Sequence, residues 1–170
     1  MKIIKTFRED IPEARFIGKK YTEADRTNGS FGRFWGEWFQ KGWFQPLEAL
    51  SPQKADTAFD GSYYGWMRGY SAFEYWIGML FPANTPVPEG YDFIDMPASS
   101  YGICWLYGNE NTGELYGMDA HNRSEGAIVK EGMKLKQGDV FAFERYNCPR
   151  FTTPDEHGNV ILDYGIQIAE

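Results

Sequence analysis

The sequence Asp10-Ile-Pro-Glu-Ala-Arg-Phe-Ile-Gly18 has a partner later in the chain, Asp95-Met-Pro-Ala-Ser-Ser-Tyr-Gly102, which also begins with an aspartate, an apolar residue and a proline. The first motif lies in a stretch, 1–22, whose polar and apolar residues alternate as they do in a strand. The second lies in another long strand, predicted over 91–107. A proline cannot donate a ladder hydrogen bond, so Pro12 and Pro97 each predict an irregularity within a strand.

The same elements are expected to follow each long strand. Aromatic residues recur at three- and four-residue spacing from Phe31 to Gln45, which predicts a helix that ends near Pro46. Two short strands come next, close enough to form a hairpin around Ser71-Ala72. The remaining elements are expected as strands at 63–70, 73–81, 140–146 and 160–169, with a second helix within 109–136. The order is therefore β-α-β-β, twice.

This order predicts an α+β fold, built as a duplicated β-α-β-β module. Two helices would lie on one face of a curved antiparallel sheet, and the opposite face would form a ligand groove. The 170 residues suit one domain, 1–170, and the proline-rich segment 82–90 separates pseudo-repeats at about 1–81 and 91–170. A ligand is expected where the halves meet, because pockets favour such junctions.

The composition is unusual in its aromatic residues, which make up 18% of the chain, with six Trp, eleven Tyr and thirteen Phe. Aromatic rings attract cations, although a bulky core would also account for them. The formal charge of -7 argues against a nucleic-acid surface, which needs clustered Lys and Arg. The same charge favours cationic or neutral partners.

The start of the chain, Met1-Lys2-Ile3-Ile4-Lys5, lacks the long apolar stretch of a signal peptide. No run approaches the ~18 apolar residues of a membrane span. We therefore expect a cytoplasmic protein without membrane contact. Cys104 and Cys148 are expected as free thiols, with one disulfide between them left open by the sequence.

Four stretches resemble the GyrI-like family, a ligand-binding domain found alone or fused to AraC- and MerR-type DNA-binding domains. They are Phe73-Glu-Tyr-Trp-Ile-Gly78, Val87-Pro-Glu-Gly90, Met96-Pro-Ala-Ser-Ser-Tyr101 and Phe143-Glu-Arg-Tyr146. The polar stretch Asp119–Glu125 departs from the family pattern. The resemblance implies a stand-alone member with the duplicated, SHS2-like module, which binds lipophilic, often cationic compounds around a central Glu.

Glu144 is the first candidate for that central acid. It shares one strand face with Val140, Ala142 and Tyr146, and Phe141 and Phe143 share the other. If the two Phe residues face the helices, Glu144 and Tyr146 face the groove. Burial would then raise the pKa of the carboxyl group. The alternative is an exposed salt bridge, for instance with Arg68, of little energetic weight.

The other aromatic residues divide by position. Those of the helical stripe, Phe34, Trp35, Trp38 and Phe39, are interpreted mainly as core. Candidate ligand-binding residues on the predicted strands are Tyr64, Trp66, Tyr75, Trp105, Tyr107 and Tyr164. A shift of one residue in register would reverse any of these assignments.

The first functional hypothesis is therefore binding of lipophilic, cationic aromatic molecules, for sensing or sequestration. The second is a hydrolase that uses Glu144 as general base, with Tyr146 assisting, against electrophilic cyclopropane compounds, as the resemblance implies for some relatives. The third is a protein-interaction role like that of gyrase inhibitors, for which the sequence offers no specific patch. No cofactor, metal ion or nucleic acid is expected, because no nucleotide-binding or metal-ligand motif is present.

Overall fold

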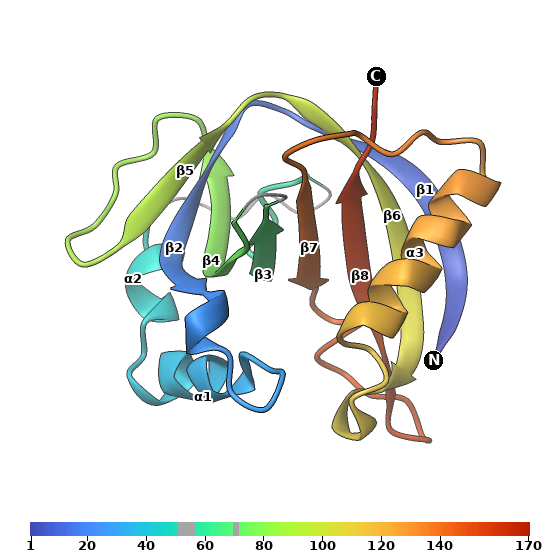
Figure 1. The fold of residues 1–170 in the computed structure, drawn as a ribbon. Coiled ribbons are helices and arrows are strands. Elements are labelled where there is room, and N and C mark those ends of the chain that lie inside the picture. Colours follow the sequence, from blue (N-terminus) through green and yellow to red (C-terminus); the bar gives the residue numbers. More distant parts are fainter. Residues whose placement is uncertain (51–56, 70–71) are drawn as a thin grey trace.

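A computed structural model describes residues 1–50, 57–69 and 72–170 of the chain. It is an α+β fold around an eight-stranded sheet with the order β1-β6-β8-β7-β3-β4-β2-β5 (Figure 1). Every pairing between neighbouring strands is antiparallel. The strands are β1 (Lys2–Ile11), β2 (Ala14–Thr22), β3 (Tyr63–Arg68), β4 (Glu74–Pro82), β5 (Asp92–Met96), β6 (Ser99–Asn109), β7 (Phe141–Tyr146) and β8 (Asn159–Gln167). The helices are α1 (Gly32–Gln40), α2 (Phe44–Glu48) and α3 (Met118–Lys130), with short 3-10 turns at Glu23–Asp25 and Glu110–Thr112.

The two proline motifs lie opposite each other and bend two long strands at the same place. Pro12 separates β1 from β2, and Pro97 separates β5 from β6. On one side of the bend β1 pairs with β6, and on the other side β2 pairs with β5. The predicted irregularities are confirmed. Because of them, each long stretch crosses from one half of the sheet to the other, as the arch at the top of Figure 1 shows.

The order β-α-β-β occurs in each half. In one half, β2 is followed by α1, β3 and β4, with α2 after α1; in the other, β6 is followed by α3, β7 and β8. The halves meet where β3 pairs with β7, with Gly65 opposite Glu144. The strand that precedes each half, β1 or β5, adds to the sheet of the other half.

The helix predicted over 31–45 is wrong in its length. Lys41 is the C-cap of α1, Gly42 takes a positive φ of 65°, and a second helix, α2, starts at Phe44. Glycine adopts that backbone conformation without the steric cost that a Cβ would bring. The helix expected within 109–136 is present as α3, which includes the polar stretch Asp119–Glu125.

The predicted hairpin between 63–70 and 73–81 is present as β3 and β4, which pair from Tyr63 and Met79 to Arg68 and Glu74. Its turn was expected around Ser71-Ala72, and Ser71 lies outside the described residues. No helix in the described parts of the chain is long and apolar enough to cross a membrane.

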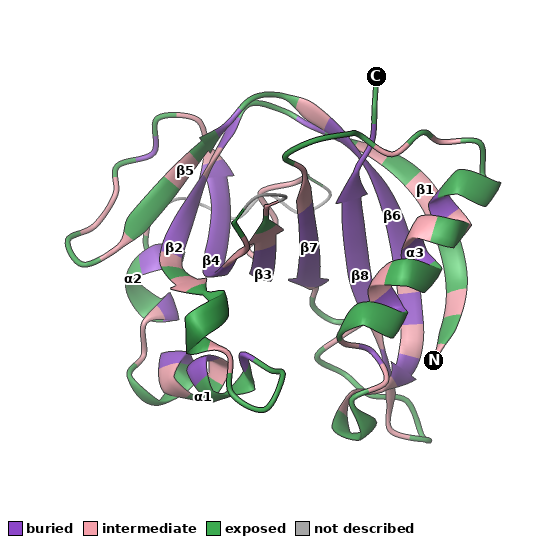
Figure 2. Ribbon diagram, viewed as in Figure 1, coloured by how far each residue is buried: buried purple, intermediate pink, exposed green. Residues whose placement is uncertain are grey.

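The two faces of the sheet are packed differently. Helices α1 and α3 lie on the same face, to either side of the junction between β3 and β7, and present exposed outer surfaces (Figures 1 and 2). Each helix has its own apolar core: α1 and α2 pack on β4 around Trp38 and Ile77, and α3 packs on β6 and β8 around Ile128 and Leu162. A third core fills the opposite face.

We expect Gly78→Ala to destabilise the fold by about 3 kcal/mol, as overpacking of a tight site does. A Cβ at Gly78 would lie 2.1 Å from the backbone oxygen of Ile17 on the neighbouring strand. The matched control is Gly36→Ala in α1, where nothing lies within 4 Å. Alanine there favours the helix by about 1 kcal/mol. Denaturant unfolding measures both, and equal effects would contradict the close approach of β2 and β4.

Candidate functional site

Glu144 lies on the face of the sheet that carries the helices, not on the opposite face as the sequence interpretation assumed. Its carboxylate accepts a hydrogen bond from Tyr75, whose hydroxyl oxygen in turn accepts one from Trp35 of α1. Phe143, which points to the other side, belongs to the core on the opposite face. The alternation along β7 was therefore predicted correctly, but the two faces were exchanged.

Two tyrosines hold one oxygen of this carboxylate. The hydroxyls of Tyr75 and Tyr146 each donate to Oε2 of Glu144, and both distances are 3.0 Å. Among the described residues, no donor bonds Oε1 and no Lys, Arg or His forms an ion pair with Glu144. The side chain retains 7% of its exposure. It is a buried carboxylate with one oxygen still available.

Gly65 makes room for this arrangement. A Cβ at this position would lie 2.2 Å from the hydroxyl oxygen of Tyr75 and 2.8 Å from Oε2 of Glu144. Gly65 lies on β3, between the strands that carry these two residues. Glycine is therefore required where the tyrosine and the carboxylate meet above the central strand.

Burial raises the pKa of Glu144 to about 6, because the ionised carboxylate loses water. The hydrogen bonds from Tyr146 and Tyr75 act in the opposite direction and favour the ionised form. The pKa of each of these tyrosines is raised, first by burial and then by the negative charge of Glu144. The hydroxyls remain protonated donors, and the carboxylate titrates close to neutral pH.

Aromatic side chains of α1 and the segment before it form one wall beside Glu144. The ring of Trp35 meets that of Tyr146 edge to face, with 4.7 Å between centroids. Phe31 stacks on Tyr75 at 4.4 Å, with the two rings almost parallel. Phe39 of α1 is 59% exposed at the rim. This wall offers ring faces and edges to a ligand.

Residues of α3 and β8 form the other wall. Tyr164 is buried next to Glu144, since the two residues are directly paired between β8 and β7. Its hydroxyl is 3.0 Å from Nδ1 of His121 on α3. Tyr116, in the segment before α3, has a pKa raised by burial and then by the charge of Glu144. This wall is more polar than the first.

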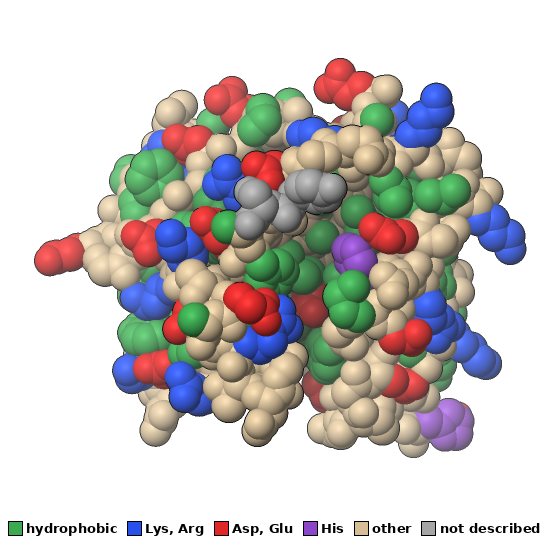
Figure 3. Space-filling model, viewed as in Figure 1, with side chains coloured by type: hydrophobic (Ala, Val, Ile, Leu, Met, Phe, Trp, Pro, Cys, Tyr) green, Lys and Arg blue, Asp and Glu red, His purple; other side chains and the backbone are tan. Residues whose placement is uncertain are grey.

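Together these residues line an open hollow that we call the helix-face cleft. Figure 3 shows it between the two halves of the molecule, with hydrophobic and acidic side chains inside. It is defined by Phe31, Trp35, Phe39, Met67, Tyr75, Tyr116, Met118, His121, Ala142, Glu144, Tyr146 and Tyr164. The hollow continues past 57–62 and 147–152 toward the opposite face.

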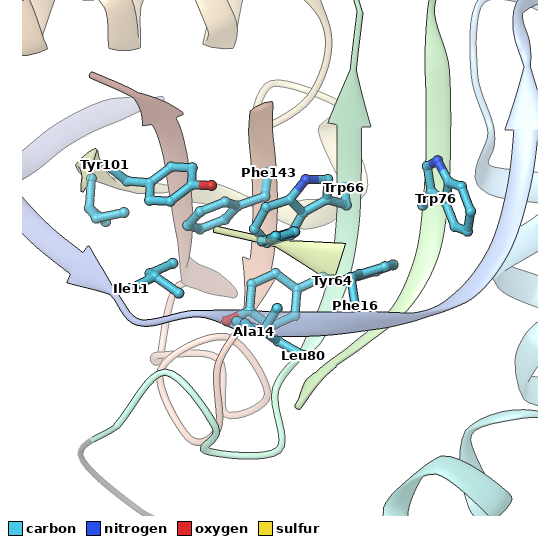
Figure 4. Packing of buried hydrophobic residues seen from close by; sticks show 11 residues of the cluster. Ile11, Ala14, Phe16, Tyr64, Trp66, Trp76, Leu80, Tyr101 and Phe143 are labelled. Atoms are coloured by element: carbon cyan, nitrogen blue, oxygen red, sulfur yellow. The ribbon is translucent and has the colours of Figure 1, made fainter. Parts of the chain in front are cut away.

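Four of the aromatic residues singled out from the sequence lie on that opposite face. Tyr64 and Trp66 are buried in its core together with Phe16, Tyr101 and Phe143 (Figure 4). Trp105 packs against Phe7, and the hydroxyl of Tyr107 hydrogen-bonds to Asp155. These four residues are therefore separated by the sheet from Glu144, Tyr75, Tyr146 and Tyr164, which come together in the helix-face cleft.

The sequence interpretation missed most residues that line the cleft, among them Trp35, Tyr116 and His121, and it also missed Gly65 beside Glu144. Trp35 was interpreted as core because it belongs to the helical stripe; its position beside the buried Phe34 and Trp38 could have identified it as the member at the stripe's edge. No pattern in the sequence indicated that Gly65 packs closely against Tyr75 and Glu144. The others, Tyr116 and His121, lie in or before a polar helix whose face was not assigned.

The described residues contain no group of three or more His, Cys, Asp or Glu side chains that could hold a metal ion. Cys104 is buried and Cys148 exposed, and both are free thiols. The titratable chemistry of the cleft therefore comes from carboxyl, phenol and imidazole groups.

Comparison with known proteins identifies the fold. No family model and no curated protein matches the chain. Among solved structures, SAV2435 bound to tetraphenylphosphonium matches with a TM-score of 0.70 at 15% identity, covering 98% of this chain and 94% of that chain. A protein from Staphylococcus aureus MU50, described as a bacterial transcription regulation protein, matches with a TM-score of 0.65 at 14% identity, covering 98% and 99%.

An integron cassette protein from Vibrio cholerae matches with a TM-score of 0.53 at 14% identity, covering 98% and 97% of the two chains. At such low identities these likenesses establish the fold alone. They confirm the α+β fold with an antiparallel sheet that the GyrI-like resemblance implied, across nearly the full length of the chain.

We expect Glu144→Gln to stabilise the ligand-free protein at pH 7.5 by about 2 kcal/mol. The folded-state pKa of about 6 lies above the ordinary 4.5, so the folded protein binds this proton more tightly than the unfolded chain does. That contribution is complete below pH 4.5 and is lost as the pH rises through 6. Glutamine accepts the same two tyrosine hydrogen bonds without a charge.

Urea unfolding at pH 5 and pH 7.5 measures the effect, and the gain should shrink to less than about 1 kcal/mol at pH 5. The control is Glu89→Gln, which removes an equal charge from an exposed position. A gain that is the same at both pH values, or no gain at all, would mean that Glu144 is not an uncompensated buried acid.

Proposed function

We propose that this protein binds lipophilic aromatic cations in the helix-face cleft, with Glu144 as the counter-charge. One observation carries the proposal: a buried carboxylate has no positive partner among the described residues and keeps one oxygen free. A charge in such a place is costly for the folded protein unless something compensates it. A bound cation supplies that compensation.

Because the Coulomb attraction must exceed the cost of dehydrating the ligand, the site favours cations with a weakly bound hydration shell. Two unit charges about 4 Å apart attract with roughly 4 kcal/mol at an effective dielectric constant of 20, before the cost of removing water is counted. A delocalised cation with aromatic substituents loses little hydration when it is buried. The apolar substituents gain about 25 cal/mol for each Å² of surface removed from water.

The aromatic wall supports the same class of ligand. Trp35, Phe31 and Phe39 present rings around the cleft, and a cation over such a ring gains roughly 0.5–2 kcal/mol. Tyr75 and Tyr146 donate their hydroxyl hydrogens to Oε2 of Glu144 and so fix the position of the carboxylate without neutralising its charge. Tyr164 and Tyr116 complete the proposed site. Tyr64, Trp66 and Tyr107 lie across the sheet and do not line the hollow, whereas Trp105, also across the sheet, lines its far end.

The structural likeness agrees with this proposal, since SAV2435 was solved with tetraphenylphosphonium, a lipophilic cation. We infer that the chain is a GyrI-like effector-binding domain that senses or sequesters such compounds. Its formal charge of -7 suits a cationic ligand and opposes direct contact with nucleic acid.

Tetraphenylphosphonium is the probe for this proposal, because its charge does not depend on pH. We expect saturable binding to the wild-type protein at pH 7.5, followed by calorimetry or tryptophan fluorescence. Glu144→Gln should weaken it by at least about 30-fold, the equivalent of half of the Coulomb attraction. Glu89→Gln, with the same change in net charge, should bind like the wild type. Equal binding by all three proteins would refute the proposal.

The affinity for tetraphenylphosphonium should also depend on pH, and the pKa of Glu144 gives the direction of the change. Below the Glu144 pKa of about 6 the carboxyl group is neutral, so affinity should fall by about tenfold for each unit of pH. Above pH 7 affinity should be constant. Glu144→Gln should show no such dependence, and a wild-type affinity that is flat between pH 5 and 8 would exclude Glu144 as the counter-charge.

A second candidate function, hydrolysis, is favoured by the same carboxyl group. A general base works best when its pKa lies near the operating pH, and Glu144 has a pKa of about 6 with Oε1 free to accept a proton from water. The activated water would add to a ring carbon of a cyclopropane conjugated to a carbonyl. The carbon–carbon bond would break and pass its electron pair to the carbonyl oxygen, and the resulting enolate would take up the proton that Glu144 had accepted, which restores the carboxylate.

Mass spectrometry with an excess of such an electrophile distinguishes the two functions. Product beyond one equivalent that disappears in Glu144→Gln would establish turnover, whereas recovery of intact compound after saturable binding would leave binding alone.

A further inference from the structure

A second carboxylate lies on the aromatic side of the hollow. It belongs to Glu48, the last residue of α2, and it accepts a hydrogen bond from the hydroxyl of Tyr63. Both residues line the same hollow as Glu144. Among residues 1–50, 57–69 and 72–170, no positively charged group forms an ion pair with Glu48. The hollow therefore contains two acids, and neither has a positive partner in the described part of the chain.

The register between β3 and β7 separates these two acids. Gly65 is paired with Glu144, and Tyr63, two residues away on the same strand, is paired with Tyr146. Two residues of a strand span about 7 Å. From there the ring of Tyr63 extends to the carboxylate of Glu48 on α2. The two carboxylates therefore lie at different points along the hollow.

A continuous series of ring contacts joins the two acids. Its members all line the hollow, and in order they are Tyr146, Trp35, Phe39 and Tyr63. The centroids of successive rings are 4.7, 6.4 and 6.1 Å apart. The hydroxyl of the first ring donates to Glu144, and that of the last ring donates to Glu48. The wall between the acids is thus aromatic, with one carboxylate at each end.

The middle of this series is open to solvent. Phe39 is 59% exposed, although it lies against Trp35, Tyr63 and the ring of Phe44. An apolar group laid over Phe39 would be removed from water together with the ring, which is favourable. The surface between the two acids therefore suits the apolar part of a ligand.

We propose that the hollow binds elongated dications, with one charge at Glu144, the second at Glu48 and an apolar spacer over Phe39. This inference rests on the proposed function of the helix-face cleft and narrows its class of ligand. A spacer is required because the two acids lie at different points of the wall. Quaternary ammonium or phosphonium groups suit both ends, since they bring no N–H donors that would need partners.

The two ends contribute unequally. Glu144 is 7% exposed and keeps Oε1 free, whereas Glu48 is exposed. The Coulomb attraction at a given distance falls about fourfold when the effective dielectric constant rises from 20 to 80. The buried acid therefore supplies most of the affinity, and the exposed acid distinguishes ligands with a second charge.

Tyr63 acts as a positioning residue for Glu48. Its ring stacks on Phe44 of α2, with 3.7 Å between centroids, and its hydroxyl holds the carboxylate at the hollow. A glutamate side chain that is already held in place loses less conformational freedom when a ligand binds. The hydrogen bond from Tyr63 leaves the negative charge of Glu48 in place.

A matched pair of ligands isolates the second charge. Both carry triphenylphosphonium at one end of a hexyl chain. The other end is trimethylammonium in the first ligand and the neutral tert-butyl group, which has the same shape, in the second. The ratio of the two affinities reports on the far end alone, because the phosphonium and the chain are identical. Calorimetry at pH 7.5 and low salt measures it, since salt screens exposed charges.

We expect Glu48→Gln to lower this ratio by about fivefold, which is about 1 kcal/mol for two charges about 4 Å apart in water. Glu89→Gln removes an equal charge from another exposed position and should keep the wild-type ratio. Tyr63→Phe keeps the ring but loses the hydrogen bond to Glu48, so it should lower the ratio by less. Glu144→Gln should weaken both ligands and leave their ratio unchanged.

The proposal is overturned if both ligands bind and their ratio is the same in the wild type and in Glu48→Gln; the proposed function would then stand without it. An equal fall in Glu89→Gln would also overturn it, because net charge and not position 48 would then select the dication. If neither ligand bound, and tetraphenylphosphonium did not bind either, the proposed function would fail and this inference with it.

Discussion

The structure depends on the buried carboxylate of Glu144, which is largely removed from water and forms no ion pair with a described residue. Glu144 could be compensated by a lysine or arginine on any neighbouring strand, yet the donors that it receives from the described residues are the neutral hydroxyls of Tyr75 and Tyr146. Neutral donors favour the ionised carboxylate but leave its charge in place. Burial dominates, so the pKa of Glu144 is raised to about 6. The glycine at position 65 follows from the same arrangement, because a side chain there would collide with Tyr75 and Glu144.

On the opposite face of the sheet, ion pairs compensate the buried charges. Arg145, the next residue along β7, points away from Glu144 and forms ion pairs with Glu9 and Asp163. Asp163 also pairs with Arg150. The alternation of a strand therefore sends adjacent residues of opposite charge to opposite faces. Since Glu9 and Asp163 hold the guanidinium of Arg145 across the sheet, the nearest cation in sequence does not neutralise Glu144.

Much of this architecture could be predicted from the sequence, because local signals specify it. Pro12 and Pro97 marked the bends, and the aromatic spacing from Phe31 onward marked the first helix. Alternation also gave the correct partners on each face of β7. It could not say which face carries the helices, because that depends on how the long strands cross between the halves. Tyr64 and Trp66 were grouped with Glu144 for a different reason: the register between β3 and β7, which sets Gly65 opposite Glu144, has no signal in the sequence of either strand.

The number of acceptors in the helix-face cleft also limits the cation. A primary ammonium group brings three N–H donors and loses strong hydration when buried. Beside Glu144 it would find Oε1 as an acceptor, so its other donors would have to keep water in the cleft or lose their partners, at a cost of about 1–3 kcal/mol for each partner lost. A phosphonium or quaternary ammonium group has no such donors and carries its apolar substituents into contact with Trp35 and Phe31. For the proposed function, we therefore expect permanent, delocalised cations to bind better than protonated primary amines, because of unsatisfied hydrogen bonds more than because of charge.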